Sequence, residues 1–246
     1  AKLQDLLIYT LKGISQIVVK AGLKSDSITE VNQQLVNSLF MIITNANFDA
    51  DAIEAQIRRM LALRDELRET SKLSGLHDAA TFQVSDRASM LEKAATIGVL
   101  STPNEDIRSL REMNIYGLKG MAAYTLHALN LGKENQEIYA FMYQLLTATL
   151  DDTLSVGDWV GLTQRTGEFG VKAMALLDKA NTSRYGTPEI TQVNIGVRDN
   201  PAILISGHDL TDLEQLLEQT QGTGVDVYTH SEMLPGHYYP AFKKYA

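Results

Sequence analysis

The sequence predicts a mainly α protein in which two three-helix bundles precede the start of an α/β domain with a parallel sheet. Amphipathic helical patterns fill the first three-quarters of the chain, part of the first pattern recurs later, and a strand–helix–strand pattern follows. We expect a helical domain over residues 1–186. The first, incomplete βαβ part of an α/β domain is expected over residues 187–246.

The helical region shows apolar residues every three or four positions, which is typical of helices with one buried face. We expect helices over about residues 3–22, 31–42, 51–70, 103–132, 134–150 and 155–180. Ser27 or Thr29 is expected to cap the second helix. Thr102 and Glu105 are expected to form a capping box at the start of the fourth, with Pro103 at its first position.

An internal repeat lies within this region. Residues 3–13 align with residues 110–120, and six of the eleven positions are identical. Each copy is followed by two further helical patterns, so we interpret the repeat as a duplicated three-helix bundle. The aligned pairs include Tyr9 with Tyr116 and Lys12 with Lys119. Chance similarity between two amphipathic helices is the alternative.

The last quarter of the chain changes in character. Residues 191–197, 202–206 and 225–229 are rich in β-forming residues, and a helical pattern over residues 209–219 separates the last two runs. This order and length predict a right-handed βαβ crossover, which joins parallel strands. A single crossover leaves the sheet edges and faces uncovered, so the domain is expected to be incomplete.

The composition excludes several classes of function. The 246 residues include 22 Lys+Arg, 30 Asp+Glu and no cysteine, with a net charge of −8. This charge argues against a nucleic-acid partner. The lack of cysteine excludes disulfides, thiol catalysis and a thiolate-held iron–sulfur cluster built by this chain alone. Polar residues interrupt the apolar stretch at residues 3–22, which argues against a membrane-spanning helix.

Two side chains that can bind a metal or transfer a proton follow the two predicted parallel strands. His208 follows residues 202–206, and Glu232 follows residues 225–229. Because neighbouring parallel strands end at the same edge of a sheet, we expect both side chains at that edge. An imidazole and a carboxylate suit a transition metal such as iron, or a proton-transfer pair. Alternatively, His208 caps the next helix or binds a backbone group, and Glu232 is solvated.

The other histidines are expected to be structural or solvent-facing. Strand alternation points His230 away from Glu232, toward a structural hydrogen bond. His237 lies in an aromatic loop, where a surface or packing role is expected, and His77 and His127 lie in the helical region. The sequence contains no Walker loop, nucleophile elbow, HExxH motif or dinucleotide-binding glycine fingerprint.

Several long motifs link the chain to one family. They lie at residues 203–213, 216–235 and 238–245 in the last quarter, and at residues 3–13, 44–49, 103–112, 116–120 and 191–196 before it. In these motifs the chain closely resembles the hybrid-cluster proteins, also called the prismane protein or hydroxylamine reductase family. The resemblance covers essentially the whole chain.

This resemblance implies an oxidoreductase that reduces hydroxylamine to ammonia and is linked to nitric oxide and nitrosative stress. It implies an iron–sulfur–oxygen hybrid cluster of the 4Fe–2O–2S type and a second cluster of the 4Fe–4S or 2Fe–2S type. His208 and Glu232 match family positions that ligate the hybrid cluster, so both are implied metal and cofactor ligands. No catalytic residue is implied beyond the cluster ligands.

The chain departs from the family pattern because it has none of the cysteine motifs. We therefore expect an N-terminal portion of a cytoplasmic enzyme that is inactive alone. The remaining cluster ligands are absent from this chain. Its implied partners are hydroxylamine, an electron-donor protein and the remaining domains of the same protein, with no nucleic acid or membrane. The alternative is a non-catalytic helical scaffold or interaction fragment that binds no cluster on its own.

Overall fold

The structure is a computed structural model that describes residues 1–43 and 47–245. Residues 44–46, part of the 44–49 motif, lie outside the described residues. The helices are α1 (Lys2–Ala21), α2 (Thr29–Met41), α3 (Ala50–Ser71), α4 (Arg87–Ala94), α5 (Glu105–Asn130), α6 (Gln136–Ala148), α7 (Val156–Tyr185) and α8 (Leu210–Thr220). The strands are β1 (Ala202–Ile205) and β2 (Asp226–Thr229), which pair in parallel. The predicted fold class is confirmed.

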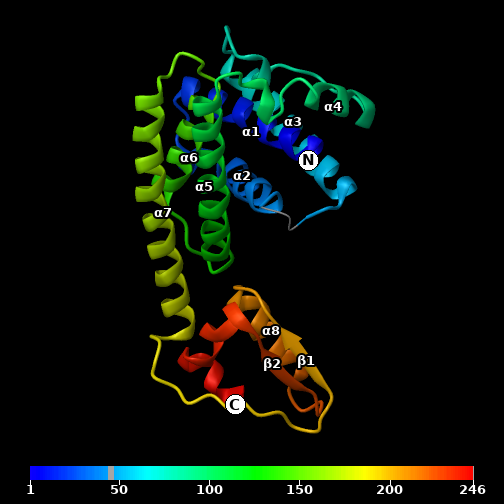
Figure 1. Cartoon of the computed structure of the whole chain (residues 1–246), viewed down its shortest axis with the longest axis vertical. Helices are drawn as coiled ribbons and strands as arrows, with labels where there is room; N and C mark the ends of the chain where they lie inside the picture. The colour runs from blue at the N-terminus through cyan, green and yellow to red at the C-terminus, as the bar shows by residue number, and fades with distance from the viewer. Residues whose placement is uncertain (44–46, 246) are drawn as a thin grey trace. The chain divides into compact units, whose positions relative to one another are not determined.

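The first group of helices consists of α1, α2 and α3, with α1 at its centre. Helix α1 packs against α3 and α6 and also contacts α2 (Figure 1). Its apolar stripe is fully buried at Leu7, Leu11 and Ile14, as the helical spacing predicts. The helix ends at Gly22, whose φ of 62° lets its N–H reach the carbonyls of Val18 and Val19.

The second group consists of α5, α6 and α7, which run side by side in Figure 1. The rings of Phe141 on α6 and Phe169 on α7 stack with centroids 4.2 Å apart. Asn114 on α5 donates to Thr163 Oγ1 at 2.9 Å and accepts from Thr166 Oγ1 at 2.6 Å, both on α7. These contacts hold the three helices together through one stacked aromatic pair and one buried polar group.

A buried arginine on α3 fixes the segment that follows this helix. The Arg64 side chain is fully buried and donates from Nη2 to the carbonyl oxygen of Phe82 at 2.7 Å. Its Nη1 donates to the carbonyl oxygen of Ala79 at 3.4 Å. The guanidinium carbon also lies 4.7 Å from the centroid of the Phe82 ring. Arg64 is therefore one of the side chains that hold the segment between α3 and α4 in place.

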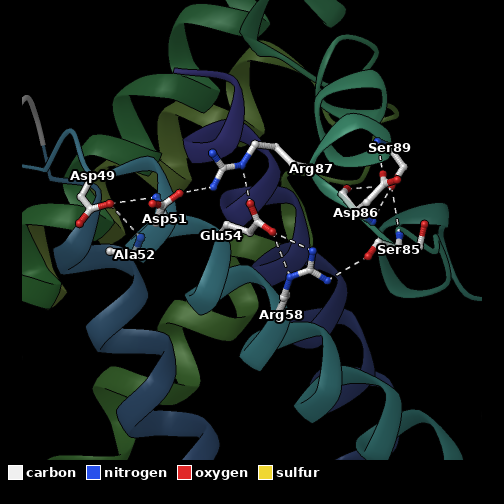
Figure 2. Close-up of polar contacts among 9 residues, drawn as sticks. All are labelled: Asp49, Asp51, Ala52, Glu54, Arg58, Ser85, Asp86, Arg87 and Ser89. Atoms are coloured by element: carbon white, nitrogen blue, oxygen red, sulfur yellow. Dashed lines mark hydrogen bonds and ion pairs between the residues drawn. The ribbon is translucent and has the colours of Figure 1, made fainter.

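Helix α4 was not predicted, although its start carries a capping signal. Asp86 accepts from the backbone N–H of Ser89 at 2.8 Å, and Ser89 Oγ accepts from the backbone N–H of Asp86 at 3.1 Å. This is a capping box closed by serine in place of glutamate. Figure 2 shows that Arg87, the first residue of α4, forms ion pairs with Asp51 and Glu54 on α3.

Neither predicted cap of α2 forms. The helix begins after Ile28, with no side-chain cap, and Ser27 Oγ donates instead to the carbonyl oxygen of Lys24 at 2.7 Å. A short 3₁₀ helix, Ser25–Ser27, precedes α2. The hydroxyl of Ser27 is used within this turn and does not cap α2.

The predicted capping box at Thr102 was also wrong. Helix α5 begins at Glu105, and Asn104 Oδ1 accepts from the backbone N–H of Ile107 at 3.0 Å. Thr102 Oγ1 accepts instead from Arg111 Nη1 at 3.2 Å. Asparagine is at least as good an N-cap as threonine, and the arginine engages Thr102 elsewhere.

Residues 191–197, although rich in β-forming residues, form neither a strand nor a helix in the structure. Ile195 and Val197 are almost fully exposed. Within the described residues, β1 and β2 pair only with each other. A β-forming composition by itself does not produce a strand, because strand formation depends on the surroundings of the segment.

The chain forms two compact units. One comprises Ala1–Leu126 and Glu134–Ala175, and the other comprises His127–Lys133 and Leu176–Ala246. The proposed domain boundary at residue 186 stays a prediction. No helix in the described part of the chain is long and apolar enough to cross a membrane.

Candidate metal-binding site

The candidate site lies at one edge of the β1–β2 pair. Ile205 is in register with Thr229, so the two strands end side by side. The backbone N–H of His230 donates to the carbonyl oxygen of Ile205 at 2.9 Å and extends the ladder one step further. Whatever follows β1 and β2 therefore emerges at the same edge of the sheet.

The turn after β1 positions His208. Gly207 has a φ of 112°, a backbone conformation that favours glycine, and the next residue is His208. Asp209 then caps α8, with its Oδ1 accepting from the backbone N–H groups of Thr211 at 2.7 Å and Asp212 at 3.4 Å. Because Asp209 is the cap, His208 does not cap the following helix.

The turn after β2 positions Glu232 in a similar way. Ser231 has a φ of 48°, which is uncommon for a residue other than glycine. It opens the 3₁₀ helix Ser231–His237, in which Glu232 faces solvent and Met233 is buried. Left-handed backbone at a non-glycine residue costs free energy and recurs at functional sites.

The two candidate side chains meet at this edge. His208 Nε2 and Glu232 Oε2 lie 3.0 Å apart, as the strand-end argument predicts. Both side chains are exposed, at 64% for His208 and 62% for Glu232. The turns after β1 and β2 position the two residues, and their exposed side chains are accessible to a further group.

A small apolar core lies under this edge and holds the two turns. It contains Leu210 and Leu213 of α8, together with Tyr185 and Met233. A Cβ on Gly236 would lie 2.3 Å from Leu213 Cδ2, so the 3₁₀ helix approaches α8 very closely. This packing fixes the segment that carries Glu232 against the helix that follows His208.

The other histidines are not part of the His208–Glu232 pair. His237 Nε2 lies 2.5 Å from Thr229 Oγ1, and the side chain of His230 is exposed. His77 Nδ1 accepts from the backbone N–H of Ala79 at 3.1 Å. His127 Nε2 lies 4.0 Å from Asp209 Oδ2, and no sequence spacing predicts this approach. Burial lowers the pKa of His127, while Asp209 opposes this shift and His208 adds to it.

Comparison with known proteins places the chain in a family. The sequence profile of the Prismane/CO dehydrogenase family matches residues 1–246. The chain belongs to this family. The predicted resemblance to prismane proteins is therefore confirmed.

Similar proteins of known name span more than this chain. A hydroxylamine reductase of Acetivibrio thermocellus is 68% identical over 245 residues, which cover 100% of this chain and 45% of the relative. Hydroxylamine reductases of Desulfovibrio desulfuricans and Clostridium perfringens are 56% and 55% identical, and each match covers 100% of this chain and 46% of the relative. The chain thus spans about half the length of the curated relatives it matches.

This member of the prismane family offers two metal donors at the strand edge. Imidazole nitrogen and carboxylate oxygen are both ligands that iron accepts, so His208 and Glu232 fit part of an iron site. Over residues 1–43 and 47–245, no group of three or more histidine, cysteine, aspartate or glutamate side chains could hold a metal ion. The described residues therefore supply part of a coordination sphere.

Proposed function

We propose that the chain is a portion of a hydroxylamine reductase, in which His208 and Glu232 provide two ligands to an iron–sulfur–oxygen cluster. The supporting observation is the 3.0 Å approach of His208 Nε2 to Glu232 Oε2 at the strand edge. It occurs in a chain 68% identical to a relative named hydroxylamine reductase. The reaction would convert hydroxylamine to ammonia and water, with two electrons and two protons taken up.

The clusters would supply the electrons for cleavage of the N–O bond. Following the family resemblance, we propose a 4Fe–2O–2S hybrid cluster and a second cluster of the 4Fe–4S or 2Fe–2S type, with electrons from a donor protein in the cytoplasm. The remaining ligands and domains would come from outside these 246 residues. The chain by itself is then catalytically inactive.

The chain's own residues have positioning roles in this proposal. His208 would use a neutral imidazole nitrogen, and Glu232 an ionised carboxylate, because both ligand types bind metals in these forms. The Asp209 cap fixes the backbone directly after His208, while the buried Met233 anchors the segment that carries Glu232. Both side chains would thus be held before the metal binds, which limits the entropy lost on binding.

The test uses the longer natural protein. We expect His208→Ala and Glu232→Gln each to lower hydroxylamine reduction by more than the roughly 10–100-fold typical of losing an outer-shell partner. Each should also change the iron content and the EPR spectrum of the cluster. His230→Ala is the matched control, since this histidine is exposed at the same strand end. Wild-type rates and spectra in both ligand variants would disprove the assignment.

A further inference from the structure

The segment that carries Glu232 is closed by a hydrogen bond between its two ends. Thr229 is the last residue of β2, and His237 is the last residue of the 3₁₀ helix Ser231–His237. Thr229 Oγ1 and His237 Nε2 lie 2.5 Å apart, and both residues are half-buried. Because the two partners are eight positions apart in sequence, their contact forms a closed loop that contains Glu232.

This loop contains a backbone conformation that is unfavourable by itself. Ser231 has a φ of 48°, and a residue other than glycine keeps such a conformation only where the surrounding structure enforces it. The backbone N–H of His230 donates to the carbonyl oxygen of Ile205 at 2.9 Å and fixes the start of the loop. The bond between His237 and Thr229 fixes its end. Both sides of the strained turn are therefore tied to the β1–β2 pair.

Apolar packing also holds this loop, but such packing is not directional. Met233 lies in one core with Leu210 and Leu213 of α8, and Gly236 approaches Leu213 closely. These contacts set how near the 3₁₀ helix lies to α8. A hydrogen bond restricts angles as well as distance, and partial burial strengthens it. The bond from His237 therefore orients the 3₁₀ helix relative to β2.

The end of β2 is a fixed reference for His208 as well. Ile205, the last residue of β1, is in register with Thr229, and His208 follows β1 after the turn at Gly207. A contact that fixes Glu232 relative to Thr229 therefore also fixes it relative to His208. Because the side chains of His208 and Glu232 are both exposed, their 3.0 Å approach depends on the backbone of the two turns.

We propose that His237 is a positioning residue for the metal-binding site. Its hydrogen bond to Thr229 keeps the loop closed and keeps Glu232 directed toward His208. This role rests on the proposed function of Glu232 as a ligand. Residues that orient metal ligands change metal affinity or activity by roughly 10–100-fold when they are removed.

Amide hydrogen exchange in this chain tests whether His237 holds the loop. We expect His237→Phe and Thr229→Val each to speed exchange at the hydrogen-bonded N–H groups of His230 and Met233 by about tenfold or more. His237→Gln and Thr229→Ser keep a hydrogen-bonding group and should remain within about threefold of the wild type. The double variant His237→Phe, Thr229→Val should exchange no faster than the faster single variant, because both lose the same bond.

The control for exchange is Leu234→Ala, since Leu234 is exposed in the same 3₁₀ helix. It should leave the exchange rates at the wild-type level. Wild-type exchange in both His237→Phe and Thr229→Val would overturn the proposal. Effects that multiply in the double variant would overturn it too, because the two side chains would then act independently.

The longer natural protein separates this role from the ligand assignment. In His237→Phe we expect a changed EPR spectrum of the cluster and at least about tenfold slower hydroxylamine reduction, both restored by His237→Gln. A purely structural loss would lower the iron content and leave the spectrum of the remaining cluster unchanged. A wild-type spectrum in His237→Phe, where Glu232→Gln changes it, would overturn the positioning role. Wild-type spectra in both Glu232→Gln and His208→Ala would instead overturn the proposed ligands.

Discussion

Among single residues, Lys12 makes the stability of the fold depend on pH. Burial lowers its pKa from 10.5 to about 8. Between these two values the unfolded chain binds more protons than the folded chain, so the free energy of unfolding rises with pH through this window. We expect this rise in the wild type and its loss in Lys12→Met, measured by urea denaturation between about pH 8 and pH 10.

Other groups also titrate in this pH range. The contribution of Lys12 is therefore the difference between the pH dependence of the unfolding free energy in the wild type and in Lys12→Met. Burial raises the pKa values of Tyr9 and Tyr143, and their effect has the opposite sign above about pH 10. These tyrosines are common to both proteins and largely cancel. Lys24→Met, which removes an exposed lysine, should keep the wild-type slope. The same slope in Lys12→Met would mean that Lys12 is not the group responsible.

The candidate ligands were predictable because two local patterns place them. His208 and Glu232 each follow a short β-forming run, and parallel strands separated by one helix end at a common edge. Which residue caps α8 was not predictable, since His208 and Asp209 are adjacent in sequence. The structure assigns the cap to Asp209 and leaves the imidazole of His208 beside Glu232.

Among the secondary-structure elements, the repeated helices α1 and α5 differ in how closely their neighbours approach. A Cβ on Gly13 of α1 would lie 2.0 Å from the carbonyl oxygen of Ala79, whereas one on the equivalent Gly120 of α5 would meet nothing within 4 Å. We expect Gly13→Ala to destabilise the fold by about 1–3 kcal/mol or more through overpacking. Gly120→Ala should stabilise it by up to about 1 kcal/mol through helix propensity.

Urea denaturation of the two glycine variants forms a matched comparison, because the same substitution is made at equivalent repeat positions. Similar unfolding free energies for Gly13→Ala and Gly120→Ala would show that Ala79 does not constrain α1. The sequence alone predicts equal effects at both positions. The difference arises only because the 3₁₀ helix Asp78–Ala80 packs against α1.

Helix positions were predicted well, and helix starts less well. Apolar spacing over several turns averages out local errors, which is why α1, α5 and α6 were found. A cap depends on one side chain that has competing partners. Thr102 was predicted as a cap but binds Arg111, nine residues along the chain. Such competition is decided by packing.

For the chain as a whole, the small number of side chains that could bind a metal together predicts that it holds no cluster by itself. The sequence has no cysteine, and the described residues contain no group of three metal donors. We expect the purified 246-residue chain to contain no stoichiometric iron or sulfide and to lack the visible absorption of an iron–sulfur cluster. Chemical analysis for iron and sulfide, together with an absorption spectrum, provides the test. A brown protein with bound iron and sulfide would contradict this expectation.

The amino-acid sequence by itself determined the fold class, the repeat and the order of the last elements, because these depend on periodic patterns and on chain length. Only the tertiary structure decided that residues 191–197 form no strand, because a β-forming composition alone does not determine whether a segment joins a sheet. It also decided that two repeat copies line one cavity, and that His208 and Glu232 meet at 3.0 Å. These features join residues distant in sequence, and their distances are fixed by packing, which local patterns do not encode.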